Sequence, residues 1–186
     1  MSRYRHPDVA ALVLAAGQGT RMDSDLPKVL HPMAGRPLLA HVLRALEDLG
    51  VGRTLVVIGH GRERVRAAFE GAELEWVVQP EQRGTGHAVL MAGPALADFR
   101  GTLLVVCGDT PLLRAPALHD LLEGHRASGA AATVLSARLP DPNGYGRILR
   151  VAGGAEDAIE GIVEECDATP EQRAIDEINS GNYAFD

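Results

Sequence analysis

From Ala11 to about Pro140, short apolar runs alternate with segments whose apolar residues recur at helical spacing. The runs expected to form buried strands are AALVLAAG, RTLVVIGHG, LEWVVQ, TLLVVCGD and AAATVLSARL. The segments expected to form helices are RPLLAHVLRALEDLG, RERVRAAFEG, GTGHAVLMAGPAL and APALHDLLEGHRASG. Strands that alternate with helices of this length are typical of βαβ units. The pattern therefore predicts an α/β, Rossmann-like fold with a mostly parallel sheet covered by helices on both faces.

After Pro140 the pattern changes to shorter segments, DPNGYGRILRVAGG, AIEGIVEE and EINSGNYAFD, which we expect to be strands joined by turns. They are either antiparallel additions to the sheet or a small subdomain over its edge. The chain stops within an apparent strand, so we expect residues 1–186 to be an incomplete domain, truncated at the C-terminus. Residues 1–10 precede the first apolar run and are expected to form a disordered tail.

Composition narrows the classes of function. A chain of 186 residues suits one domain, and a net charge of −7 is unfavourable for binding nucleic acid or a membrane surface. The N-terminus has no signal-peptide core, and no apolar run is long enough to span a membrane. Two cysteines without a CxxC motif indicate a cytoplasmic protein rather than a disulfide or zinc framework.

Polar motifs follow three of the expected strands, at the edge where α/β sheets bind ligands: LAAGQGTRM, QPEQRGTGHA and CGDTPL. The first lacks the third glycine of a dinucleotide fingerprint, because Met22 stands there, and it is not a P-loop. Its glycines either make a tight turn or free backbone N–H groups for phosphate oxygens. Arg21 and Lys28, the only lysine of the chain, add positive charge beside it.

The other two motifs carry candidate ligands for a cation and a base. Asp109 in CGDTPL is either a turn residue or a ligand of Mg²⁺, which prefers carboxylate and phosphate oxygens. Gln79 and Gln82 have amides that can read the edge of a base, although each is also compatible with a solvated loop. His87 lies where a helix should begin, so packing or capping explains it better than a role as a base.

Together these motifs resemble a known family. LAAGQGTRM with DLPKVL resembles the signature of sugar-nucleotide pyrophosphorylases. EQRGTGHA, GDTPLL, DPNGYGRI, GIVEE and EINSGNY extend the likeness to the uridyltransferase domain of the bacterial bifunctional enzyme that makes UDP-N-acetylglucosamine. The resemblance runs from about Ala11 to the last residue and implies a sheet of the nucleotide-diphospho-sugar transferase type.

The resemblance implies a Mg²⁺-dependent transfer of uridylyl from UTP to N-acetylglucosamine 1-phosphate, without a covalent intermediate. The residues implied for the nucleotide are Leu14, Ala16, Gly17, Gln79, Gly84 and Thr85. The residues implied for catalysis are Arg21 and Lys28, the metal ligand is Asp109, and the sugar residues are Gly146, Glu164 and Asn179. The resemblance further implies an acetyltransferase β-helix domain, absent from this chain, through which the full-length protein would form a homotrimer.

Two positions differ from the family's usual pattern. Cys107 stands where an aromatic residue is usual, and Glu165 and Cys166 replace a His-Lys pair. Three other functions stay open on the residues alone. They are a nucleotidyltransferase for another sugar phosphate or base, a non-catalytic nucleotide-binding domain, and a nicotinamide-binding domain, against which Met22 argues.

Overall fold

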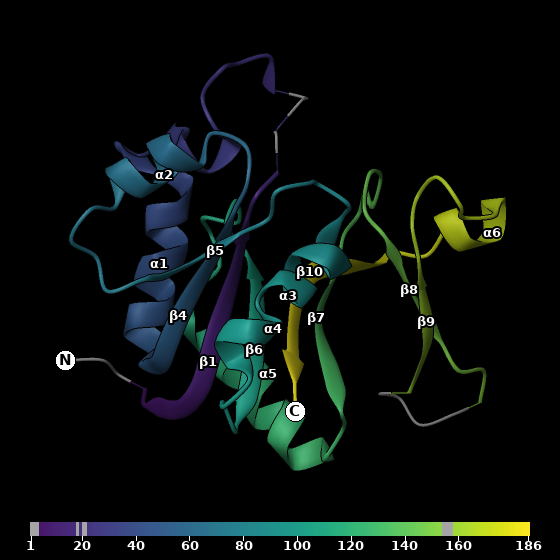
Figure 1. Cartoon of the computed structure of the whole chain (residues 1–186). Coiled ribbons are helices and arrows are strands. Elements are labelled where there is room, and N and C mark those ends of the chain that lie inside the picture. Colours follow the sequence, from purple (N-terminus) through teal and green to yellow (C-terminus); the bar gives the residue numbers. More distant parts are fainter. Residues whose placement is uncertain (1–3, 18, 20–21, 154–157) are drawn as a thin grey trace. The chain divides into compact units, whose positions relative to one another are not determined.

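The computed structural model describes residues 4–17, 19, 22–153 and 158–186 (Figure 1). Its chain divides into two compact units. The first comprises Met1–Thr133 with Tyr183–Asp186, and the second comprises Val134–Asn182. Among the described residues, no helix combines the length and the apolar character needed to cross a membrane.

The first unit is built on four parallel strands in the order β5-β4-β1-β6. Their bounds are β1 His6–Ala15, β4 Val51–Ile58, β5 Glu75–Val78 and β6 Thr102–Cys107. The last residues of β10 (Glu177–Phe185) pair with β6 in the antiparallel direction. The sheet of this unit is thus mixed and mostly parallel, as the apolar runs predicted.

Helices connect these strands at the predicted places. Their bounds are α1 Leu38–Leu49, α2 Arg62–Ala68, α3 Thr85–Met91, α4 Gly93–Leu96 and α5 Ala115–Ser128. The single helix expected over GTGHAVLMAGPAL is wrong, because α3 ends at Met91 and α4 starts at Gly93. Pro94 lacks a backbone N–H and cannot continue the ladder of helical hydrogen bonds. A 3-10 turn, η2 (Lys28–Leu30), and a hairpin of β2 (Pro32–Met33) with β3 (Arg36–Pro37) were not predicted.

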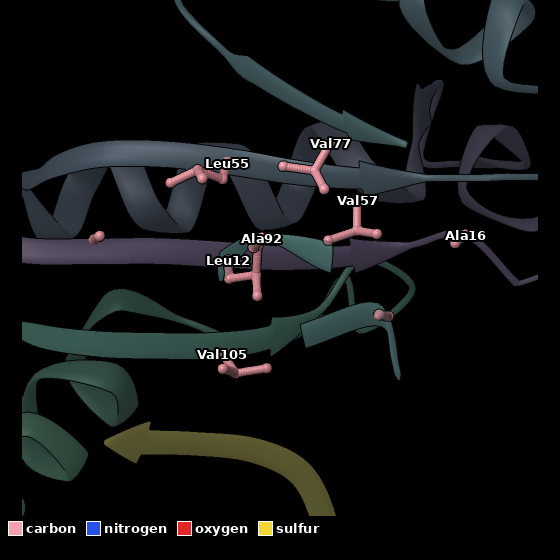
Figure 2. Close-up of a cluster of buried hydrophobic side chains, with 9 residues drawn as sticks. Leu12, Ala16, Leu55, Val57, Val77, Ala92 and Val105 are labelled. Carbon is pink, nitrogen blue, oxygen red and sulfur yellow. The ribbon is translucent and has the colours of Figure 1, made fainter. Parts of the chain in front are cut away.

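Both faces of the parallel strands are covered. Figure 2 shows the apolar cluster on one face, where α3 packs against side chains from four neighbouring strands: Leu12, Leu55, Val57, Val77 and Val105. Successive side chains of a strand point to opposite faces, so Val9, Ala11 and Val13 of β1 face the other side. There α1 contacts β1 and β4 and packs beside α5. The predicted two-sided cover is confirmed.

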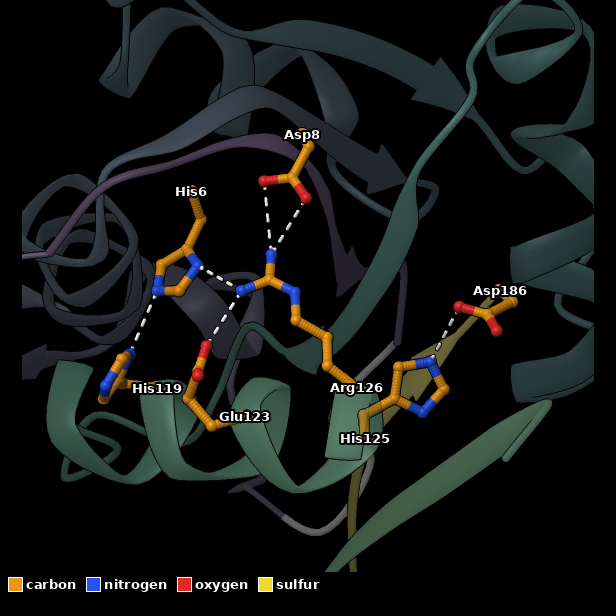
Figure 3. A network of polar contacts seen from close by, with 7 residues as sticks. All are labelled: His6, Asp8, His119, Glu123, His125, Arg126 and Asp186. Carbon is orange, nitrogen blue, oxygen red and sulfur yellow. Dashed lines mark hydrogen bonds and ion pairs between the residues drawn. The ribbon is translucent and has the colours of Figure 1, made fainter. Parts of the chain in front are cut away.

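The start of β1 is fixed by a polar cluster against α5 (Figure 3). His6 is buried, and its Nε2 lies 3.1 Å from Nδ1 of His119. Arg126 approaches Nδ1 of His6 at 3.0 Å and donates to both carboxylate oxygens of Asp8 and to Glu123. Since the guanidinium can only donate, His6 Nδ1 accepts, and Nε2 carries the proton that His119 receives. Arg126 thus supplies the positive charge that pairs with both carboxylates of this cluster.

The expected disordered tail over residues 1–10 is therefore wrong for its second half. β1 begins at His6, whose N–H donates to the carbonyl of Gly50 at 2.8 Å. Tyr4 also stacks on His119, with ring centroids 4.4 Å apart. An apolar pattern that starts near Ala11 cannot reveal a strand end held by polar contacts to a helix far along the chain. Residues 1–3 lie outside the described part.

The second unit consists of short strands and one helical turn: β7 Ala132–Arg138, β8 Arg147–Arg150, β9 Ile159–Val163 and α6 Pro170–Arg173. β8 pairs with β9 and with β10 in the antiparallel direction, as expected for the residues after Pro140. β7 pairs with β10 but is largely solvent-accessible, so its prediction as a fully buried strand was wrong. Its apolar run is short, and a run of that length does not by itself tell a buried strand from a half-exposed one.

Candidate active site

A cavity of about 270 Å³ opens at the carboxyl ends of β1, β5 and β6, within the first unit. The predicted loops after these strands do converge there. The lining residues are Leu14, Ala15, Ala16, Gly17, Lys28, Val29, Gln79, Gln82, Gly84, Thr85, Ala88, Cys107 and Asp109. Every predicted nucleotide residue lines this cavity, together with Lys28 and Asp109, so sequence motifs more than 90 residues apart meet in one place.

Open backbone and small side chains form one wall of the cavity. Gly17 is exposed, and a side-chain carbon added there would meet nothing within 4 Å. Gly84 has φ +93 and precedes the first turn of α3, where Thr85 is exposed. Backbone amides at such positions can approach a ligand closely, because no side chain intervenes.

Gln79 is the buried polar residue of the cavity, with only 3% of its surface exposed. Its amide nitrogen donates to the carbonyl of Gly84 at 3.2 Å and lies 3.0 Å from Nδ1 of His87. These contacts use the donor side of the amide and hold it in a fixed direction. The amide oxygen is then the atom that Gln79 offers to a ligand, and it can accept a hydrogen bond from an imide N–H. His87 thus helps to orient Gln79 through a hydrogen bond, a contact that the expectation of packing or capping did not include.

Lys28 is positioned by the η2 turn. The Leu30 N–H donates to the Pro27 carbonyl at 2.8 Å, and both Pro27 and Val29 are buried. Arg64 of α2 holds the preceding segment by donating to the carbonyl of Asp25 at 2.9 Å. The turn that carries Lys28 is thus anchored on both sides.

Gly19 lets the first loop pass over the stem of Lys28. Its φ is +65, a region that disfavours other residues, and a Cβ there would lie only 2.8 Å from Cβ of Lys28. Gly19 is therefore required by its backbone and by the lysine it covers. Arg21, the other predicted catalytic cation, lies outside the described residues.

Lys28 and Asp109 form an ion pair inside the cavity, with Nζ 2.5 Å from Oδ2. Their side chains are 35% and 29% exposed, so solvent screens the pair only partly. Asp109 supplies the only carboxylate among the described lining residues. One carboxylate completed by phosphate oxygens and water suits Mg²⁺, which rarely takes an all-protein set of ligands. Asp109 therefore fits a divalent cation that arrives with a phosphate-bearing ligand.

Cys107 lines the same cavity but is not a nucleophile at neutral pH. Burial raises the pKa of its thiol to about 11, and the neighbouring Asp109 adds to this effect while Lys28 opposes it. A thiol that stays protonated is a poor nucleophile. The sequence favoured an inert cysteine and noted its unusual position, but it did not identify Cys107, Ala15, Val29 or Ala88 as lining residues. Ala15 and Val29 adjoin predicted site residues along the chain, Cys107 lies two residues before Asp109, and Ala88 lies about one helical turn after Thr85.

The three residues predicted to hold the sugar lie in the second unit and are close to one another. The N–H of Asn179 donates to the carbonyl of Gly146 at 2.8 Å. A Cβ at Gly146 would lie 3.2 Å from Oε1 of Glu164, so the glycine leaves room for that carboxylate. Glu164 is exposed and Asn179 is partly exposed. The structure thus brings together three residues that three separate motifs contribute.

Sequence comparison supplies relatives for most of the chain. The model of the MobA-like NTP transferase domain matches residues 11–165. Bifunctional protein GlmU from Thermobifida fusca is 56% identical over 183 residues, which cover 95% of this chain and 37% of that protein. GlmU from Pelobacter propionicus is 52% identical over 180 residues, which cover 96% of this chain and 38% of that protein. The chain thus spans less than two fifths of the length of these relatives.

Solved structures share the fold. A UDP-glucose pyrophosphorylase complexed with UDP-glucose superposes with a TM-score of 0.76 at 18% identity, over 95% of this chain and 75% of that one. HddC from Yersinia pseudotuberculosis, complexed with GMP-PN, gives a TM-score of 0.72 at 20% identity, over 95% of this chain and 76% of that one. The fold expected from the motifs is confirmed, and the family match extends over most of the residues that build the cavity. The chain belongs to the MobA-like NTP transferase domain family.

Proposed function

We propose that this domain transfers a uridylyl group from UTP to N-acetylglucosamine 1-phosphate, which gives UDP-N-acetylglucosamine and pyrophosphate. An oxygen of the sugar phosphate attacks the α-phosphorus of UTP, and the bond to the β-phosphate oxygen breaks as pyrophosphate leaves. The observation that carries the proposal is the cavity in which Gln79, open glycine backbone and the Lys28–Asp109 pair meet. The choice of uracil and N-acetylglucosamine as the base and the sugar rests on the motifs EQRGTGHA, DPNGYGRI and EINSGNY, which resemble those of the uridyltransferase domain.

In this proposal the nucleotide lies along the wall formed by Leu14, Ala16, Gly17, Gly84 and Thr85. Backbone amides there hydrogen-bond the base and the phosphates. Gln79 reads the uracil, because its amide oxygen can accept the N3–H of the base while its nitrogen stays bound to Gly84 and His87. Cytosine carries no proton at the corresponding nitrogen, so the same contact favours uracil over cytosine.

Charge neutralisation carries the chemistry, since the reaction needs no protein nucleophile. Lys28 holds the phosphates of UTP and of the leaving pyrophosphate, and Arg21 is proposed for the same task. Asp109 holds Mg²⁺, which when bound neutralises charge on the phosphate oxygens. Gly146, Glu164 and Asn179 hold the N-acetylglucosamine moiety through its hydroxyl and acetamido groups.

The test is an assay of pyrophosphate release by the complete gene product with UTP, N-acetylglucosamine 1-phosphate and Mg²⁺. Release that depends on the sugar phosphate supports the proposal, and release that is absent or independent of it contradicts the proposal. Glucose 1-phosphate in place of the acetamido sugar, and CTP or GTP in place of UTP, should give much lower kcat/KM. Thermal stabilisation by UTP without turnover would instead identify a nucleotide-binding domain without catalysis.

A further inference from the structure

Arg147 is the largest fully buried side chain of the described residues and the proposed reaction gives it no task. It begins β8 directly after Gly146, and 0% of its surface is exposed. Burial of a guanidinium is costly unless the group is paired and hydrogen-bonded. The partners of the Arg147 guanidinium therefore indicate which segments this buried charge holds in place.

The guanidinium of Arg147 joins three segments of the second unit. One terminal nitrogen donates to the carbonyl of Tyr145, in the turn before β8. The other donates to the carbonyl of Arg173, at the end of α6, and forms an ion pair of 2.8 Å with Oε2 of Glu165. Its Nε is buried and has no hydrogen-bond partner among the described residues. The two terminal nitrogens of the guanidinium are thus held by partners, whereas Nε is left without one.

Glu165 completes the link from the other side. The same Oε2 accepts the N–H of Gly144 at 3.3 Å, and the backbone carbonyl of Glu165 accepts from Arg173 at 3.4 Å. A carboxylate that binds both a guanidinium and a backbone N–H has few orientations open to it. Glu165 thus ties the turn after β9 to the turn before β8.

Both members of the pair are immediate neighbours of proposed sugar residues. Gly146 precedes Arg147, Glu164 precedes Glu165, and the Asn179 N–H binds the carbonyl of Gly146. A Cβ at Gly146 would lie 3.2 Å from Oε1 of Glu164, so a side chain there would push this carboxylate aside. A shift of either turn would therefore change the spacing of the groups that face the sugar.

We infer that Arg147 and Glu165 are a positioning pair that sets the geometry of the sugar site and thereby the affinity for the hexosyl phosphate. The inference rests on the proposed function and deepens it. Neither side chain needs to touch the substrate. An ion pair in which the guanidinium is buried adds little net stability compared with an apolar pair, whereas its fixed directions specify one arrangement of the turns. The pair should therefore affect recognition of the sugar phosphate more than recognition of the nucleotide.

The experiment is steady-state kinetics of the complete gene product with Glu165→Gln, varying each substrate in turn. Glutamine keeps the shape and one acceptor oxygen but removes the charge. We expect the KM for N-acetylglucosamine 1-phosphate to rise on the order of tenfold, because small displacements of binding groups have large effects, while the KM for UTP stays within about twofold. Glu160→Gln, an exposed glutamate on β9, is the matched control and should change neither KM.

Hydrogen exchange of the segment 141–147 gives a second readout that does not depend on turnover. Glu165→Gln should speed exchange there, including the Gly144 amide, and Glu160→Gln should not. An unchanged sugar KM in an active Glu165→Gln protein, or an equal rise of both KM values, overturns the inference. A wild-type protein with no sugar-dependent release of pyrophosphate contradicts the proposed function itself, so the two failures are distinguishable.

Discussion

In the first unit the buried residues of strands β1, β4 and β6 are apolar apart from His6 and Thr102, and the charged groups of the site stand beyond the strand ends. In the second unit the buried set includes Arg147 and Glu177. Glu177 accepts from Ser136 and Arg150, and the bond from Arg150 lowers the pKa of its carboxyl although burial opposes this shift. One unit is held by the removal of apolar surface from water, and the other depends more on specific polar partners.

This difference has consequences for how each unit responds to substitution. An apolar core loses stability in proportion to the atoms removed, and a second truncation nearby adds further loss. A buried ion pair loses most when one partner is left alone, and removal of both partners relieves part of that loss. Substitutions can therefore tell the two kinds of core apart.

The largest effects are expected from paired substitutions in the two cores. Glu165→Leu should lower the free energy of unfolding by about 3 kcal/mol, because it leaves the fully buried guanidinium of Arg147 without its anionic partner. Arg147→Met with Glu165→Leu should recover part of this loss. In the first unit Leu12→Ala should cost about 2–5 kcal/mol, and Leu12→Ala with Leu55→Ala should cost more than either alone. Urea titration of each variant measures these values, and a double variant of the ion pair that is less stable than Glu165→Leu would contradict this difference between the units.

The next effect concerns the charges at the end of the apolar core. Asp109→Asn should lower turnover on the order of 100- to 1,000-fold, because it removes the charge of the proposed ligand for the cation that neutralises the phosphates. Since Asp109 lies at the cavity wall and not in the core, the melting temperature should change little. The control is Asp98→Asn on an exposed loop. Near-normal turnover of Asp109→Asn at saturating Mg²⁺ would contradict the role of Asp109 as a metal ligand.

A smaller effect should follow from a change that keeps the charge. Lys28→Arg should lower turnover about tenfold, because a planar guanidinium cannot reproduce the compact ammonium that pairs with Asp109 beneath Gly19. Arg44→Lys on the exposed face of α1, where the arginine pairs with Glu47 and Asp48, is the matched reverse exchange. Equal, small changes in kcat from both variants would show that Lys28 acts only as a general positive charge.

The smallest effect concerns the polar cluster that starts β1, an exception within the first unit. Burial, with the nearby Arg126, lowers the pKa of His6, so the folded protein resists its protonation. Above the ordinary histidine pKa of about 6.5 both states are neutral there, and as the pH falls below it the unfolded state takes up the proton first. Stability should therefore fall with acidification from about pH 6.5 until the pH passes the lowered pKa. Urea unfolding at pH 7.5 and 5.5 should show a smaller loss for His6→Gln than for the wild type, and equal losses would contradict this linkage.

The same contrast explains how much of the fold followed from the sequence. The parallel strands and their helices were predictable because their cores are apolar and a period of 2 or 3.6 is visible in the chain. The helix break at Ala92, the strand start at His6 and the partial exposure of β7 were missed. They depend on a missing donor, on polar contacts to a distant helix and on sheet pairing, which a local apolar pattern does not record.

For the candidate site, the loops at the carboxyl ends of β1, β5 and β6 were predictable because parallel strands end at one edge of a sheet. The motifs also indicated which residues meet there. The direct Lys28–Asp109 pair was not predictable, since nothing in the local sequence tells that the η2 turn brings the ammonium to this carboxylate. Nor was the ion pair of Glu165 with Arg147 predictable, because the sequence showed Glu165 only as a departure from the family's usual His-Lys pair.

Under the proposed function, Lys28 and Asp109 each exchange their ionic partner when the ligands bind, because they pair with one another inside the cavity. A triphosphate alone would draw the ammonium away and leave a bare carboxylate beside a polyanion, whereas a divalent cation alone would leave the ammonium facing another positive charge. When both arrive together, each side chain exchanges its partner for a better one. Thermodynamic linkage then requires that UTP and Mg²⁺ raise each other's affinity by the same factor. Under the proposed function, the nucleotide and the metal are therefore expected to bind the cavity more tightly together than either binds alone.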